Sequence, residues 1–82
     1  MKVQYYALYD KVATRFMSPI PFASEAEAVR SFKALCEHPE PGKFVEDYEF
    51  FKIFEYDDVI GEASNNSPVR VASYLSVIGG EQ

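Results

Sequence analysis

The fold is decided by the stretch Asp47-Tyr48-Glu49-Phe50-Phe51-Lys52-Ile53-Phe54-Glu55-Tyr56-Asp57-Asp58, the densest aromatic segment of the chain. Its ring-rich composition is typical of a β-strand. Successive side chains of a strand point to opposite faces, so one face should carry Tyr48, Phe50, Lys52, Phe54 and Tyr56, and the other Glu49, Phe51, Ile53, Glu55 and Asp57. The first face holds more apolar surface than a solvated strand needs. We therefore expect it to be covered.

Length and composition predict one small folded domain, residues 1–82, with 48% hydrophobic and 16% aromatic residues. No apolar run approaches the ~18 residues of a membrane span, and the start Met1-Lys2-Val3-Gln4-Tyr5 lacks the apolar core of a signal peptide. The lone Cys36 rules out an internal disulfide framework and favours a reducing compartment. We expect a soluble, intracellular protein that does not contact membranes.

Charge is unevenly distributed along the chain. The net charge is −5, with +2 over residues 1–23, −7 over residues 24–66 and zero over the last sixteen residues. Sequence-independent affinity for nucleic acid comes from neutralising phosphates, so this balance works against strong electrostatic binding. Any contact with DNA is expected to use the basic N-terminal third.

The first half of the chain predicts a hairpin followed by a helix. Lys2 to Tyr9 alternates like a strand, Asp10-Lys11 begins a turn, and residues 13–22 return as a strand interrupted by Pro19 and Pro21. Ser24 to Glu27 has the pattern of a capping box, with a helix running on to His38. The apolar stripe of this helix should lie on the sheet; it consists of Ala28, Val29, Phe32, Leu35 and Cys36.

The second half predicts another hairpin and a C-terminal element. Residues 57–61 form a turn, a short strand follows around Glu62 and Ala63, and residues 65–68 interrupt the chain again. Apolar residues from Val71 to Ile78 favour a short helix, capped by Ser67 and begun by Pro68, although the β-branched residues there also fit a strand. The expected fold class is α+β: an antiparallel sheet of three to four strands, built from two hairpins, with the main helix packed on one face and a short C-terminal helix.

The residues do not predict an enzyme, a cofactor or a metal site. Cys36 lies on the core stripe of the helix, and His38 is expected at the surface beside a turn. Asp57, Asp58 and Glu62 lack the alternating oxygen ligands of a calcium loop. No glycine-rich phosphate loop, nucleophile elbow or paired-cysteine zinc spacing occurs in the sequence.

The aromatic face has two explanations. It could be a platform on which single-stranded nucleic acid stacks, with phosphates contacted by basic residues, or it could be core and dimer interface. The candidate platform rings are Tyr5, Tyr6, Tyr9, Phe50, Phe54 and Tyr56. Acidic residues flank every part of this platform, so chemistry alone favours packing and dimerisation.

Several short motifs, in this order and spacing, resemble the small non-structural protein of gokushovirus-type microviruses, the tailless phages with circular single-stranded DNA. They are Tyr6-x-x-Tyr9-Asp10, Phe16, Pro21-Phe22, Ala28-x-Arg30-x-Phe32, Asp47-Tyr48-x-Phe50-x-x-Ile53, Tyr56-Asp57 and Gly61. The resemblance spans roughly residues 3 to 63. Phe54 stands where the family commonly has glycine, so the central strand is more aromatic in this member.

The resemblance implies a phage accessory protein in the host cytoplasm that acts on the single-stranded genome during replication or packaging. It implies DNA binding as the leading molecular hypothesis; the alternative is a dimeric module that contacts viral replication or capsid proteins without touching DNA. The family offers no established binding residues to transfer. As candidates for nucleic-acid contact we take Lys2, Tyr6, Lys11, Arg15, Arg30 and Lys52, and for a homodimer interface Tyr48, Phe50, Phe54 and Tyr56. Arg30 falls on the outer face of the helix. An ion pair with a nearby acid is the alternative to a phosphate contact for this residue.

Overall fold

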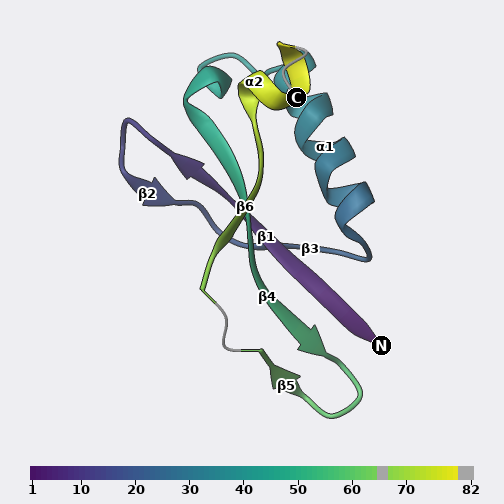
Figure 1. Ribbon diagram of the computed structural model, residues 1–82. Coiled ribbons are helices and arrows are strands. Elements are labelled where there is room, and N and C mark those ends of the chain that lie inside the picture. The colour runs from purple at the N-terminus through teal and green to yellow at the C-terminus, as the bar shows by residue number, and fades with distance from the viewer. Residues whose placement is uncertain (65–66, 80–82) are drawn as a thin grey trace.

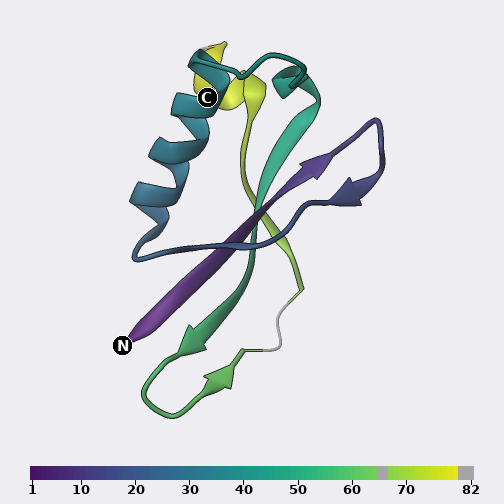
Figure 2. The same cartoon turned by 180° about the vertical axis from the view of Figure 1, so that it is seen from behind.

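The computed structural model describes residues 1–64 and 67–79 and contains an antiparallel sheet with two helices (Figures 1 and 2). The strands are β1 (Lys2–Asp10), β2 (Arg15–Phe16), β3 (Ile20–Phe22), β4 (Tyr48–Asp57), β5 (Glu62–Ala63) and β6 (Val69–Ser73). The helices are α1 (Glu25–Glu37), a single 3-10 turn η1 (Val45–Asp47) and α2 (Tyr74–Ile78). The predicted α+β class, with one main helix and one short C-terminal helix, is confirmed.

Strands β1 and β4 form the centre of the sheet. They pair antiparallel from Lys2 opposite Asp57 to Asp10 opposite Tyr48. Strands β2 and β3 pair with β1 on one side, and β5 and β6 pair with β4 on the other. The predicted interruption of the returning strand at Pro19 is confirmed, because β2 and β3 are two short pieces, whereas the interruption at Pro21 is wrong, since Pro21 lies within β3 opposite Tyr5. Pro21 can occupy β3 since that strand pairs only with β1, and the missing N–H costs no ladder bond at a sheet edge.

Helix α1 begins and ends where its sequence predicts. The Ser24 hydroxyl oxygen accepts a hydrogen bond from the backbone N–H of Glu27 at 3.2 Å, and His38 is the C-cap before Pro39. Ala28, Phe32 and Cys36 are buried along one side of the helix. This apolar stripe packs onto the sheet, as expected, and places α1 along one face (Figure 1).

Stacked aromatic rings join α1 to the sheet. Phe50 of β4 stacks on Phe32 of α1 with ring centres 5.0 Å apart and on Tyr6 of β1 at 5.3 Å. Phe22 of β3 closes this group edge-on. Val45, Tyr48 and Ala72 complete the buried cluster with the helix stripe. The core therefore lies between α1 and one face of the β1–β4 pair.

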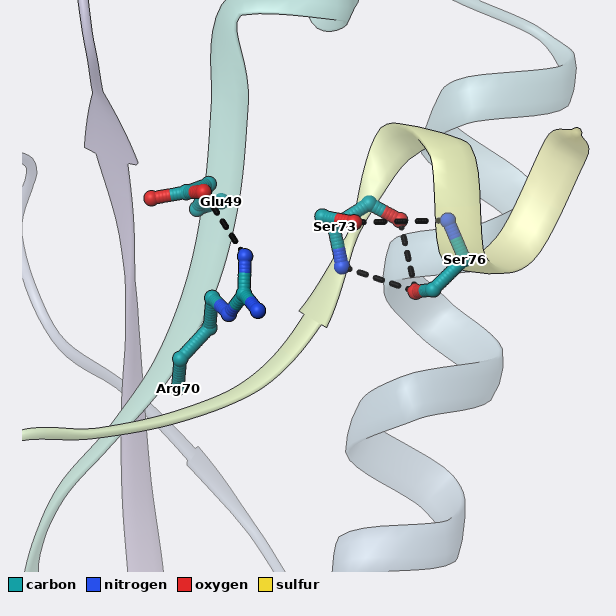
Figure 3. Close-up of polar contacts among 4 residues, drawn as sticks. All are labelled: Glu49, Arg70, Ser73 and Ser76. Atoms are coloured by element: carbon teal, nitrogen blue, oxygen red, sulfur yellow. Dashed lines mark hydrogen bonds and ion pairs between the residues drawn. The ribbon is translucent and has the colours of Figure 1, made fainter. Parts of the chain in front are cut away.

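The C-terminal segment is both strand and helix. The expected helix start at Pro68 is wrong, since residues 69–73 form β6 and the helix begins only after Ser73. Ser73 and Ser76 form a reciprocal capping box there (Figure 3). Residues 69–73 form a strand and not a helix because pairing with β4 satisfies their backbone hydrogen bonds and buries Ala72 opposite Phe50. The predicted break at residues 65 and 66 lies outside the described residues.

Candidate functional site

A β-bulge in β4 decides which side chains share a face. Tyr5 lies opposite Phe54 and Tyr6 lies opposite Lys52, so Ile53 is an extra residue in β4. An extra residue reverses the alternation of side chains beyond it. Phe54 therefore leaves the face of Phe50. The single aromatic face predicted for residues 48 to 56 is split in two.

The ring contacts confirm this division. The rings that contact Phe50 belong to the core beneath α1. On the other side Tyr5 stacks on Phe54 with centres 4.6 Å apart. Tyr9, Phe16 and Phe51 contact one another there at 4.8 to 6.0 Å. No ring contact among the described residues joins the two sides.

We call the sheet face turned away from α1 the open face. Its aromatic side chains are Tyr5, Tyr9, Phe16, Phe51, Phe54 and, by alternation, Tyr56 opposite Val3. Phe16 is 41% exposed and the other five are half-buried. Ala7 lies between Tyr5 and Tyr9, is 1% exposed and is not part of the α1 core, so the open-face rings cover it. The open face is thus an aromatic surface made of two groups of rings, with the small Ala7 between them along β1.

The same bulge removes acidic side chains from the open face. Glu55 is paired with Gln4, on the α1 side, and its carboxylate accepts a hydrogen bond from Lys52 at 2.8 Å. This bond and the charge of Lys52 lower the pKa of Glu55. Glu49 is on the open face, where Arg70 of β6 donates to it at 3.0 Å (Figure 3). The negative charge of Glu49, which would repel an anionic ligand on the open face, is therefore paired with the positive charge of Arg70.

Cations lie at one end of the open face. Lys11 follows β1 and lines a hollow of about 450 Å³ with Arg70, Tyr74, Glu46 and Glu49, together with Ser73 and Leu75. Arg15 precedes Phe16 in β2 and is exposed. Both belong to the hairpin that joins β1 to β2, which projects away from α1 in Figure 1. Acids balance these cations, because Glu46 and Glu49 line the same hollow and Asp10 lies opposite Arg15.

The other candidate cations do not lie on the open face. Lys2 is exposed opposite Asp57 and lines a second hollow with Glu55 and Glu62. Lys52 is held by Glu55 on the α1 side. Arg30 is exposed on α1, and among residues 1–64 and 67–79 no ion pair joins it to an acid. The structure thus brings Lys11 close to the open-face rings. Arg15 lies opposite Asp10, on the other face of β2 from Phe16, and Lys2, Lys52 and Arg30 lie elsewhere.

Three aromatic candidates are wrong because they are core residues. Tyr6 is 0% exposed, and its hydroxyl donates to the Gln4 side chain at 2.6 Å. Burial raises the pKa of Tyr6, with Glu25 and Glu55 adding to the shift. Tyr48 and Phe50 are 5% and 3% exposed against the α1 cluster, so neither can face a partner. Of the expected interface residues, Phe54 and Tyr56 are on the open face.

Cys36 is buried, and desolvation raises the pKa of its thiol to about 11, far from that of a reactive cysteine. No group of His, Cys, Asp and Glu side chains in residues 1–64 and 67–79 is arranged to hold a metal ion. No helix within these ranges is long and apolar enough to cross a membrane.

Sequence reasoning left Phe16, Phe51 and Arg70 out of the candidate site. Simple alternation assigned Phe51 to the face opposite Phe54, and only the bulge at Ile53 reunites them. Tyr5 and Tyr9, which alternate along β1, do indicate from the sequence that this face of the strand is aromatic. Arg70 was missed because its segment was assigned to a helix.

The fold and the site define a small α+β protein with one sheet face covered by a helix and the other left as an open aromatic surface. The chain belongs to the Phage ORF5 protein family, whose model matches residues 3–77. It is therefore a phage protein, which confirms that part of the resemblance seen in the sequence. No curated protein and no solved structure matches the chain.

Proposed function

We propose that this protein is a non-enzymatic phage accessory protein that binds single-stranded DNA through its open face, during replication or packaging of a microvirus-type genome in the host cytoplasm. The observation that carries the proposal is the bulge at Ile53, which gathers aromatic rings from β1, β2 and β4 on the face that α1 does not cover. Rings on an accessible sheet surface suit base stacking, which contributes about 1 to 3 kcal/mol per base. The phage family and the sequence resemblance support the choice of ligand.

The distribution of charge also supports this proposal. The sequence alone places acids around all the rings, whereas the fold turns Glu55 to the other face and pairs Glu49 with Arg70. Lys11 lies at one end as a phosphate contact, and the exposed Arg15 of the same hairpin, opposite Asp10, supplies a second. The net charge of −5 still opposes tight electrostatic binding. Stacking should therefore supply most of the affinity.

A titration at several salt concentrations tests the proposal. With about two phosphate contacts, the logarithm of the binding constant should fall with a slope of about −1.4 against log salt. Raising sodium chloride from about 50 to about 200 mM should then weaken binding only about sevenfold. The probe is a fluorescein-labelled oligothymidine read by anisotropy, with a duplex of equal length as the control. Absence of binding to the single strand at the lowest salt would refute the proposal.

A homodimer is the second candidate, in which the open face contacts a second copy and the pair recruits viral replication or capsid proteins. The observation in its favour is that the open-face rings are uncharged, and that Phe16 among them is 41% exposed beside Met17, which is 36% exposed. Small domains commonly gain stability by such pairing. Sedimentation of wild type and Phe54→Asp tests it, with Phe44→Asp as the matched control. A dimer that survives Phe54→Asp would remove the open face from the interface.

A further inference from the structure

The hollow of about 450 Å³ lies at the end of the sheet where the β1–β2 hairpin, the turn η1 and helix α2 meet. Its walls include Tyr74 and Leu75, the first two residues of α2. The backbone N–H of Lys11 donates to the Asp47 carbonyl at 2.9 Å, which ties the hairpin to η1 beside the hollow. Figures 1 and 2 show η1, the teal turn before β4, side by side with α2. The side chains around the hollow therefore belong to elements that hold one another in place.

Four charged side chains line this hollow, two of each sign: Lys11, Glu46, Glu49 and Arg70. Arg70 and Glu49 form an ion pair with each other at 3.0 Å (Figure 3). Among residues 1–64 and 67–79, neither Lys11 nor Glu46 forms an ion pair, and both are exposed. The rim is neutral in total and presents one open cation and one open anion. A partner of a single sign would leave one of these two facing a like charge.

Exposed apolar side chains accompany these two charges. Leu75 lines the hollow and is 63% exposed, and Val12, next to Lys11 in the hairpin, is 75% exposed. Interfaces between proteins typically have apolar side chains at the centre and polar or charged side chains at the rim. We call Lys11, Val12, Glu46 and Leu75 the end surface. None of them belongs to the rings of the open face.

The end surface is complementary to itself in charge. In a twofold contact between identical chains, residue i faces residue j of the partner, and j faces i. One open cation and one open anion on the same surface can then form two ion pairs across the axis. A second copy supplies both missing charges at the spacing at which the first copy needs them, whereas nucleic acid supplies only negative charge.

We propose that the end surface binds a second copy of the chain through a twofold contact, with Lys11 opposite the partner's Glu46 and Leu75 near the axis. This contact differs from a dimer through the open face, because the open-face rings stay outside it. The inference does not rest on the proposed function. The two share only Lys11, so DNA bound at Lys11 should compete with this dimer.

Charge reversal tests the contact by sedimentation in the absence of nucleic acid. Wild type should approach twice its chain mass of 9.3 kDa as its concentration rises. Lys11→Glu and Glu46→Lys each place like charges opposite each other at both pairs, so each should weaken the dimer about tenfold or more. An equal mixture of the two variants should regain the wild-type dimer, because each variant supplies the charge that the other has lost.

Lys33→Glu is the matched control, because Lys33 is exposed on α1 and undergoes the same change of charge. It should dimerise like wild type, whereas Leu75→Ala should weaken the dimer without any change of charge. Wild type that stays monomeric at every concentration overturns the proposal. So does a dimer that Lys11→Glu leaves intact and Phe54→Asp breaks, because that dimer uses the open face. A mixture as weak as its two components overturns the pairing of Lys11 with Glu46.

Discussion

Replacing Phe50 and Phe54 by alanine, one at a time, tests the bulge on which the site depends. Regular alternation puts both rings on one face of β4, where they would make similar contributions to stability. In the structure Phe50 is 3% exposed between Phe32 and Tyr6, whereas Phe54 is half-buried on the open face. The two substitutions should therefore have clearly different effects.

The size of the difference follows from what each ring leaves behind. Phe50→Ala opens a cavity inside a closed cluster and should cost about 3 to 5 kcal/mol. Phe54→Ala loses part of the transfer free energy and its stack with Tyr5, but water can fill the space, so about 1 to 2 kcal/mol is expected. The difference is about 2 kcal/mol, roughly a thirtyfold change in the folding equilibrium.

Urea denaturation followed by circular dichroism gives both free energies of unfolding. A domain of this length has a total stability of about 4 to 12 kcal/mol, so Phe50→Ala can leave the chain largely unfolded. Phe50→Leu and Phe54→Leu then serve as the milder pair, with the same order of effects. Equal losses at the two positions, within about 0.5 kcal/mol, would contradict the bulge and with it the open face.

Three further predictions concern other parts of the molecule. Thr14 has a φ of 55° in the first hairpin, so Thr14→Gly should raise the free energy of unfolding by about 0.5 to 1 kcal/mol, measured by the same denaturation. Because burial raises the Cys36 pKa to about 11, its reaction with an aromatic disulfide reagent at pH 8 should be at least about a hundredfold slower than in urea, and a fast native reaction would contradict its packing. Lys52 lowers the pKa of Glu55, so the stability this pair provides is present at neutral pH and is lost as the pH falls below the ordinary value of 4.5. Glu55→Gln should therefore lose less stability than wild type between about pH 5 and about pH 3 in thermal melts, and identical pH profiles would refute this role.

Local sequence patterns were sufficient for α1 and for the positions of the hairpins. Ser24 accepts from Glu27 as the capping pattern requires, and the stripe through Phe32 is buried. These features depend on residues a few positions apart, so their energetics are present in the sequence itself. The phage character was also available from the order of short motifs, and the family match agrees with it.

The C-terminal segment shows where local preference is insufficient. Residues 69–73 fit a helix and a strand about equally well, and pairing with β4 decides for the strand. Ser73 then caps the helix in place of the expected Ser67. Tertiary context makes this choice because an unpaired edge of β4 would leave backbone groups without partners.

The sequence by itself determined the fold class, the helix that covers one sheet face and the surplus of rings in β4, because composition, periodicity and capping are local properties. Only the tertiary structure decided which of those rings remain accessible. The extra residue at Ile53 moves Phe54 away from Phe50 and joins it to Tyr5, while Glu55 turns toward Lys52. A bulge depends on how two strands pair over their whole length, so the sequence of one strand does not predict it.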